Sequence, residues 1–147
     1  MISPCIDVTA PLSSPNSSLL LVVAAALFDA DGRILLAQRP AGKAMAGLWE
    51  FPGGKLHDRE TPEIALVREL EEELGIQTSP GCLYPLTFVS YAYPERHLLM
   101  PLYGCRTWQG KPEGREGQTL AWARAADLGQ YDMPPADLPL VRFLQTA

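Results

Sequence analysis

The stretch of sequence that decides the fold runs from Gly54 to Ile76 and reads GKLHDRETPEIALVRELEEELGI. Thr61-Pro62 predicts the start of a helix, because threonine is a favourable N-cap and proline at the first helical position loses no hydrogen bond. Gly75 predicts its end, because glycine adopts the left-handed conformation that terminates helices without strain. Gly53 and Gly54 predict a turn at the start of the stretch. The chain is therefore expected to be organised around one helix that follows a glycine turn.

This helix carries an unusual density of glutamates. At 100° per residue, its apolar side comprises Ile64, Val67, Leu70 and Leu74. An arc of about 100° on nearly the opposite side comprises Glu69, Glu72 and Glu73, with Glu71 outside it. From the helix alone, a solvated acidic surface is the simpler interpretation, because each like-charge pair costs only about 0.2–0.5 kcal/mol. The alternative is a site for a hard cation such as Mg²⁺, which binds through carboxylates, water and phosphates.

The spacing around these glutamates favours the metal site. Gly54 is followed after five residues by Glu60, and after seven more by the run Arg68-Glu69-Leu70-x-Glu72-Glu73-x-Gly75-Ile76. The pattern matches the Nudix box at every defined position, and nine restricted positions at fixed spacing are a specific signal. The chain resembles a Nudix hydrolase from about Leu19 onward. The resemblance implies an α+β fold in which a mixed β-sheet lies between α-helices.

The rest of the chain mixes strand-like and loop-like segments, which also indicates an α+β or mixed-sheet fold. At 147 residues it fits one domain. We expect a flexible, Ser- and Pro-rich N-terminal arm over residues 1–17 and a Nudix hydrolase domain over residues 18–147. Leu19–Phe28 predicts a central strand buried on both faces, and Asp29–Gly32 predicts a hairpin turn into the next strand. Further strands are expected at 33–39, 48–51, 82–93, 97–108 and 119–123, loops at 40–47 and 109–118, and a C-terminal helix at 136–144.

Composition limits the partners. The net charge of −5 argues against binding nucleic-acid polymers or anionic membranes. It leaves nucleotides open, because a divalent cation can neutralise carboxylates and phosphates locally. No segment approaches the roughly 18 apolar residues of a membrane span. Three cysteines without metal-ligand spacing indicate free thiols in a reducing, cytoplasmic setting, and we expect a monomer or a weak dimer.

The resemblance implies roles for the box glutamates. Glu69, Glu72 and Glu73 would hold Mg²⁺, with Mn²⁺ as an alternative, because phosphoanhydride hydrolysis needs metal ions that neutralise developing charge. Glu69 is also the leading candidate for the general base that activates water. The Gly53 carbonyl would be a further metal ligand of a kind that the family uses.

Three other polar residues are expected to support this centre. Arg68 would orient a box glutamate through an ion pair, since arginine grips carboxylates bidentately. Its expected partner is Glu60, which could alternatively reach the metal through water or act as a favourable charge at the helix N-terminus. Glu116 lies in the segment Gly114–Gln118, which resembles the loop of MutT-type enzymes that contributes a fourth carboxylate to the metals. Its alternative is an ordinary solvent-facing position.

The closer resemblance is to the MutT subgroup, which removes oxidised guanine nucleotides such as 8-oxo-dGTP. Arg39 and Arg96 match arginines near the substrate in that subgroup and are good donors to phosphate or base edges. Phe51 is expected either to stack on the base or to belong to the core. Asp137 departs from the prototype, which carries asparagine. Because an ionised aspartate only accepts hydrogen bonds, it suits the N–H donors of guanine or the amino group of cytosine.

Together these features predict a Mg²⁺-dependent nucleoside triphosphate pyrophosphohydrolase that releases a monophosphate and pyrophosphate. The expected substrates are oxidised nucleotides such as 8-oxo-dGTP, which implies nucleotide-pool sanitation in support of DNA replication and DNA repair. The alternative within the class is a CTP or dCTP pyrophosphohydrolase. The alternative of another class is a non-catalytic module that binds nucleotides or recognises oxidised guanine. Such a module has no reason to retain the complete acidic box.

Overall fold

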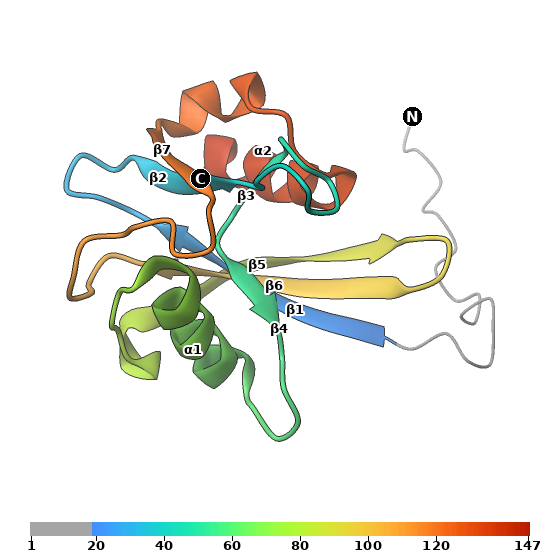
Figure 1. The fold of residues 1–147 in the computed structure, drawn as a ribbon, viewed down its shortest axis with the longest axis horizontal. Coiled ribbons are helices and arrows are strands. Elements are labelled where there is room, and N and C mark those ends of the chain that lie inside the picture. Colours follow the sequence, from blue (N-terminus) through green and yellow to red (C-terminus); the bar gives the residue numbers. More distant parts are fainter. Residues whose placement is uncertain (1–18) are drawn as a thin grey trace.

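The computed structural model describes residues 19–147, which form two β-sheets with helices on either side (Figure 1). The four-stranded sheet has the order β4-β1-β6-β5, and the three-stranded sheet has the order β3-β2-β7. The strands are β1 (Leu19–Leu27), β2 (Ile34–Gln38), β3 (Trp49–Glu50), β4 (Gly53–Lys55), β5 (Leu83–Ala92), β6 (His97–Cys105) and β7 (Thr119–Ala123). The helices are α1 (Pro62–Leu74) and α2 (Leu138–Thr146), with short 3₁₀ helices at Pro80–Cys82, Ala125–Gln130 and Pro135–Asp137. The α+β fold predicted from the sequence is confirmed, while the predicted arm at 1–17 lies outside the described residues.

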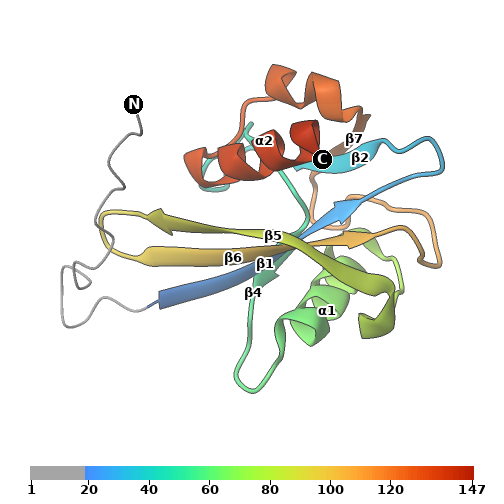
Figure 2. The ribbon, with the colours of Figure 1, turned by 180° about the vertical axis from the view of Figure 1, so that it is seen from behind.

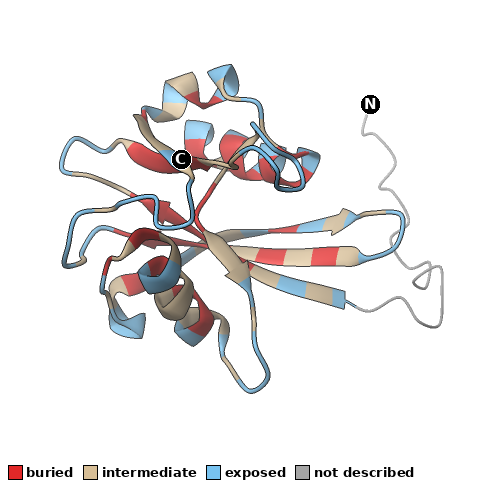
Figure 3. Ribbon diagram, in the orientation of Figure 1, coloured by how far each residue is buried: buried red, intermediate tan, exposed pale blue. Residues whose placement is uncertain are grey.

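Strand β1 lies between two hydrophobic clusters because its side chains alternate between the faces of the sheet. Ala24 and Ala26 belong to the cluster that includes α2, whereas Val23, Ala25 and Leu27 belong to the cluster that includes α1. The prediction of burial on both faces holds for this half of the strand, as the red segments of Figure 3 show. It is wrong for Leu19 and Leu21, which are 48% and 41% exposed. Figure 2 shows the reason, since this end of β1 extends beyond α1.

The turn Asp29–Gly32 joins two sheets instead of closing a hairpin within one. The Asp29 carboxylate accepts hydrogen bonds from the Arg33 and Asp31 amides, as expected for a tight turn. Beyond it, β1 and β2 share only the isolated bridge between Phe28 and Ile34. The predicted hairpin turn is present at this antiparallel bridge. The pairing does not continue along the strands, because both edges of β1 are occupied by β4 and β6, and both edges of β2 by β3 and β7.

Gly53 and Gly54 form the start of strand β4 and not the predicted turn. They pair with Ala24 and Val23 of β1. A Cβ atom on Gly53 would lie 1.9 Å from the Val23 carbonyl oxygen, and one on Gly54 would lie 2.4 Å from the Glu69 carboxyl carbon. The close approach of β4 to β1 and α1 therefore requires glycine at both positions.

Helix α1 begins and ends where the sequence predicts. The Thr61 hydroxyl accepts a hydrogen bond from the Ile64 amide (3.3 Å), and Gly75 has the left-handed φ of 72°. The predicted apolar face is only partly right, because Ile64 is 50% exposed. The buried side chains are Ala65, Leu66, Leu70 and Leu74. The face that packs on the sheet is thus turned toward the acidic arc, which brings Glu69 and Glu73 to the edge of the packed interface.

Strand β6 and the C-terminal helix differ slightly from the predicted segments. Strand β6 ends at Cys105, opposite the start of β5 at Leu83, and so is shorter than the predicted segment 97–108. The predicted C-terminal helix begins with a 3₁₀ turn, and its α-helical part is α2.

Cys82 and Cys105 are free thiols. Among residues 19–147, no helix has the length and apolar character needed to cross a membrane.

Candidate active site

A cavity of about 480 Å³ lies between the two sheets and brings most of the predicted site residues together. Its lining includes Gly53 and Gly54 of β4, Glu69 and Glu73 of α1, and Glu116 of the loop at 109–118. It also includes Arg39, Glu50, Phe51, Tyr93 and Asp137. The cavity therefore joins an acidic group beside α1 to a second, partly apolar group beside the start of α2.

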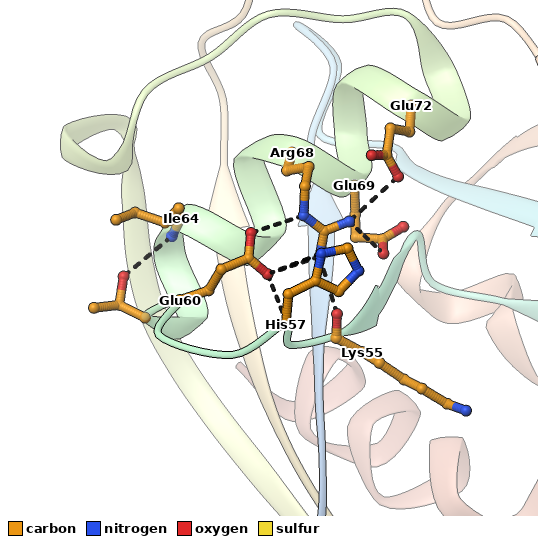
Figure 4. Close-up of polar contacts among 8 residues, drawn as sticks. Lys55, His57, Glu60, Ile64, Arg68, Glu69 and Glu72 are labelled. Carbon is orange, nitrogen blue, oxygen red and sulfur yellow. Dashed lines mark hydrogen bonds and ion pairs between the residues drawn. The ribbon is translucent and has the colours of Figure 1, made fainter.

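Arg68 organises the outer part of the acidic group (Figure 4). Its Nε and Nη2 atoms donate to the two carboxylate oxygens of Glu60, at 2.7 and 2.9 Å. Its Nη1 atom donates to Glu69 Oε1 at 3.0 Å and to Glu72 Oε2 at 3.2 Å, and Nη2 also reaches the Lys55 carbonyl at 3.1 Å. The bidentate pair predicted between Arg68 and Glu60 is present, and the guanidinium lies against two box glutamates at the same time.

Glu60 holds the Arg68 guanidinium in place through both of its carboxylate oxygens. The Arg68 guanidinium lowers the pKa of Glu60 to about 2, and the His57 amide, which donates to the same carboxylate at 2.7 Å, adds to the effect. Glu60 therefore remains ionised throughout the neutral range. A permanently charged carboxylate holds the arginine in one orientation, because charge-assisted bidentate pairs fix geometry as well as charge.

Glu69 and Glu72 differ in their surroundings although they share Arg68. The Glu69 side chain is 14% exposed and lines the cavity, whereas that of Glu72 is 53% exposed and lies outside the lining. Burial raises the pKa of Glu69, and the ion pair with Arg68 opposes that rise. Glu69 therefore presents a carboxylate to the cavity, whereas Glu72 is connected to it through Arg68.

Glu73 is the least compensated carboxylate of the site. It accepts one long hydrogen bond, from the Gly53 amide at 3.4 Å. Burial, together with the nearby carboxylates of Glu69, Glu50 and Glu116, raises the pKa of Glu73 to about 9. A buried carboxylate among like charges favours a bound cation, because charge that is neither solvated nor paired is costly.

The donor set suits a hard divalent cation. Carboxylate and carbonyl oxygens are the ligands that Mg²⁺ prefers, and this end of the cavity offers them from α1, β4 and the loop at 109–118. Within residues 19–147, no three acidic, histidine or cysteine side chains are already gathered at metal-binding distances. The contacts explain this, since Arg68 holds Glu69 and Glu72 while Glu73 turns to the Gly53 amide.

Asp137 dominates the other end of the cavity. Asp137 is the sole buried charged residue in the described part of the chain, with 7% of its surface exposed. Burial raises the pKa of Asp137 to about 7, the Glu50 carboxylate contributes to the rise, and Arg39 opposes it. Arg39 itself donates from Nε to Glu50 Oε2 at 3.0 Å and from Nη1 to the Ala44 carbonyl at 3.3 Å. Three polar groups from distant parts of the sequence thus meet at one end of the cavity.

The lining residues that sequence reasoning did not single out include Glu50, Tyr93 and Gln118. The signal for Glu50 was an acidic residue between two aromatic residues in a short predicted strand. Burial raises the pKa of the Glu50 carboxyl.

Phe51 both lines the cavity and belongs to the core cluster, so its two predicted positions are compatible. Arg96 lies exposed in the hairpin between β5 and β6 and is absent from the lining, where Tyr93 of the same hairpin takes part. The role of Arg96 stays a prediction.

These observations define a cavity with an acidic end, and comparison with known proteins identifies the family. The chain belongs to the NUDIX domain family, whose model matches residues 23–142. The predicted family and enzyme class, a Nudix hydrolase, are thereby confirmed.

Individual relatives are similar to this chain over most of their length. Over 115 residues the chain is 38% identical to an 8-oxo-dGTP diphosphatase of Escherichia coli K12, covering 78% of this chain and 88% of the relative. Over 125 residues it is 40% identical to a CTP pyrophosphohydrolase of the same organism, covering 83% and 89%. A MutT structure from a study of Aliivibrio salmonicida and Vibrio cholerae aligns with a TM-score of 0.75 and 35% identity, covering 88% of this chain and 98% of that one.

Proposed function

We propose that this Nudix hydrolase is a Mg²⁺-dependent nucleoside triphosphate pyrophosphohydrolase that converts 8-oxo-dGTP to the monophosphate and pyrophosphate. The observation that carries the proposal is the single cavity that joins the carboxylates of Glu69 and Glu73 to the buried Asp137. One end suits a metal-bound triphosphate and the other a base. The similarity to 8-oxo-dGTP diphosphatases supports the same substrate class.

The residues beside α1 would hold the metal. Glu69, Glu72, Glu73 and Glu116, with the Gly53 carbonyl, form the proposed ligand set. A divalent cation bound there, Mg²⁺ or alternatively Mn²⁺, would neutralise phosphate charge as the phosphoanhydride is cut.

The protein groups would prepare water and substrate for reaction. Arg68 occupies Glu69 Oε1, so the second carboxylate oxygen of Glu69 is the one directed to accept a proton from the attacking water. The guanidinium favours the ionised form of Glu69, which a general base requires. The Nε atom of Arg39 is paired with Glu50, and its other N–H groups would donate hydrogen bonds to the substrate.

Asp137 would read the base edge. With a pKa of about 7, it can accept hydrogen bonds when ionised and can both accept and donate when protonated. The protonated form offers an oxopurine edge the same donor and acceptor pair as an asparagine. The ionised form suits the cytosine amino group, and the 40% identity to a CTP pyrophosphohydrolase favours CTP or dCTP as the second candidate.

A triphosphate panel tests the substrate. We expect Mg²⁺-dependent release of pyrophosphate, with the highest kcat/KM for 8-oxo-dGTP among dGTP, dCTP, CTP and a nucleoside diphosphate sugar. Highest kcat/KM for dCTP or CTP would transfer the assignment to the second candidate. Selectivity for the diphosphate sugar would reject both.

The non-catalytic alternative is tested by Glu73→Gln. This variant keeps the shape of the side chain but removes its charge, so turnover should fall by orders of magnitude while the fold is unchanged by circular dichroism. A folded wild-type protein that binds nucleotide without any turnover would instead indicate a recognition module or sensor.

We further propose that the protein acts as a monomer or weak dimer in the cytoplasm, where it removes oxidised nucleotides from the nucleotide pool and so limits mutation. The free thiols of Cys82 and Cys105 support a reducing compartment.

A further inference from the structure

The loop at 109–118 is attached to the C-terminal end of α1. The last carbonyl groups of a helix have no partner within the helix and need one elsewhere. Here the Glu73 carbonyl accepts a hydrogen bond from the Arg115 amide, and the Leu74 carbonyl accepts one from the Glu113 amide, both at 3.0 Å. The loop thus takes the place of a further helical turn.

The side chain of Gln118 connects the same two elements a second time. Its Nε2 atom donates to the Glu73 carbonyl at 3.1 Å, and its Oε1 atom accepts from the Glu116 amide at 2.7 Å. A carboxamide is suited to this bridge because it carries a donor and an acceptor on one planar group. The Gln118 side chain therefore ties the backbone of Glu116 directly to the backbone of Glu73.

Two glycines allow this tight arrangement. A Cβ atom on Gly114 would lie 2.0 Å from the Gln118 carbonyl oxygen, and Gly117 has the left-handed φ of 84°. The turn 114–118 consequently folds back so that Gln118 faces Glu116. Glu116 then lines the same cavity as Glu69 and Glu73.

We propose that Gln118 is a positioning residue for the metal centre, holding Glu116 against α1 so that its carboxylate reaches the same cation as Glu69 and Glu73. The proposal rests on the function proposed above and assigns to Gln118, which also lines the cavity, a role through its hydrogen bonds to the backbone of Glu116 and Glu73. Without the bridge, an exposed loop carboxylate must be ordered at each binding event, which costs conformational entropy. Gln118 therefore acts through Glu116 alone.

A double-mutant cycle tests this dependence, with Mn²⁺ binding to the nucleotide-free protein measured by electron paramagnetic resonance. Gln118→Ala and Glu116→Gln are each expected to weaken Mn²⁺ binding by about 10-fold or more, the usual effect of losing a supporting group of a metal site. In the Glu116→Gln background, Gln118→Ala should cause no further loss. If the two losses multiply in the double variant, Gln118 acts independently of Glu116 and the proposal is overturned.

Additional variants separate positioning from general damage. Gln118→Leu keeps the approximate size of the side chain but removes both its donor to the Glu73 carbonyl and its acceptor for the Glu116 amide, so it should weaken Mn²⁺ binding in a protein of unchanged circular dichroism. It decides the question in the same way if Gln118→Ala does not fold. Gln109→Ala is the control on the same loop, because the hydrogen bonds recorded for Gln109 are those of its backbone with Gln77. Amide exchange at Glu116 should accelerate in both Gln118 variants and stay unchanged in Gln109→Ala.

The outcomes distinguish this inference from the proposed function. If Mn²⁺ binding depends on Gln118 through Glu116 but no triphosphate is hydrolysed, the function fails and the positioning role stands. If the wild type hydrolyses triphosphates while neither Gln118 variant changes Mn²⁺ binding, the function stands and the positioning role is refuted.

Discussion

Replacing Asp137 by asparagine should stabilise the protein at neutral pH while leaving it almost unchanged in acid. The carboxyl of Asp137 has a pKa of about 7 in the folded protein, against an ordinary value of 3.8. Below pH 4 the group is protonated in the folded and unfolded states, so it has no effect on the pH dependence. As pH rises through the window from about 4 to 7, the unfolded state ionises first and the free energy of unfolding falls.

The size of this effect follows from the pKa difference. Each unit corresponds to about 1.4 kcal/mol, so the full cost of ionising Asp137 in the folded state is about 4 kcal/mol at pH 8. Asparagine has nearly the same shape and never ionises, and the attraction between Asp137 and Arg39 is already included in the pKa of about 7. We therefore expect Asp137→Asn to be more stable than the wild type by about 2–4 kcal/mol at pH 8, with the difference disappearing near pH 4.

Urea denaturation at a series of pH values, in the presence of a metal chelator, measures this difference. Asp132→Asn, on the exposed part of the same turn, is the matched control for removing a charge from this segment. A stability difference between Asp137→Asn and the wild type that does not change between pH 4 and pH 8 would refute the reasoning. So would an asparagine variant that is less stable than the wild type at pH 8.

Three further substitutions test other parts of the structure. Arg68→Lys should lower kcat about 10- to 100-fold with little change in KM, because lysine cannot grip Glu60 bidentately and hold Glu69 at once; steady-state kinetics with unchanged kcat would contradict this. Gly54→Ala should reduce turnover strongly, because the new methyl group would displace the Glu69 carboxylate, whereas Gly81→Ala, where nothing lies within 4 Å, should keep normal kinetics. Leu66→Ala should lower the free energy of unfolding by about 2–5 kcal/mol, and Ile64→Ala should lower it by less than about 1 kcal/mol. Equal losses in thermal denaturation would show that Leu66 is not on the buried face of α1.

The limits of α1 and the contact between Arg68 and Glu60 were predictable because both depend on residues close in sequence. A threonine cap, a proline at the first turn and a terminal glycine act within a few residues. An arginine and a glutamate at the spacing of a known motif meet through the same local geometry. The metal role of the box remains a proposal, and its arrangement as an ion-pair cluster is an observation.

The orientation of α1 was not predictable from its own periodicity. Counting apolar residues placed Ile64 on the buried face, yet the packed face is the one that contains Ala65 and Leu66. A small residue such as alanine adds little to an apolar pattern, but it allows a helix to approach a sheet closely. The close contact of Gly54 with Glu69 follows from that approach, and it requires glycine at position 54.

By itself, the sequence determined the family, the α+β class and the identity of the acidic helix, because a fixed motif and local capping signals encode them within one continuous stretch. Only the tertiary structure decided which face of that helix meets the sheet, that β1 and β2 belong to different sheets, and that Arg39, Glu50 and Asp137 meet at one end of a cavity. The physical reason is that these relations depend on strand pairing and on burial between segments up to a hundred residues apart. Their effect on Asp137 and Glu73, whose pKa values rise to about 7 and about 9, comes from that burial and not from the residues next to them in the chain.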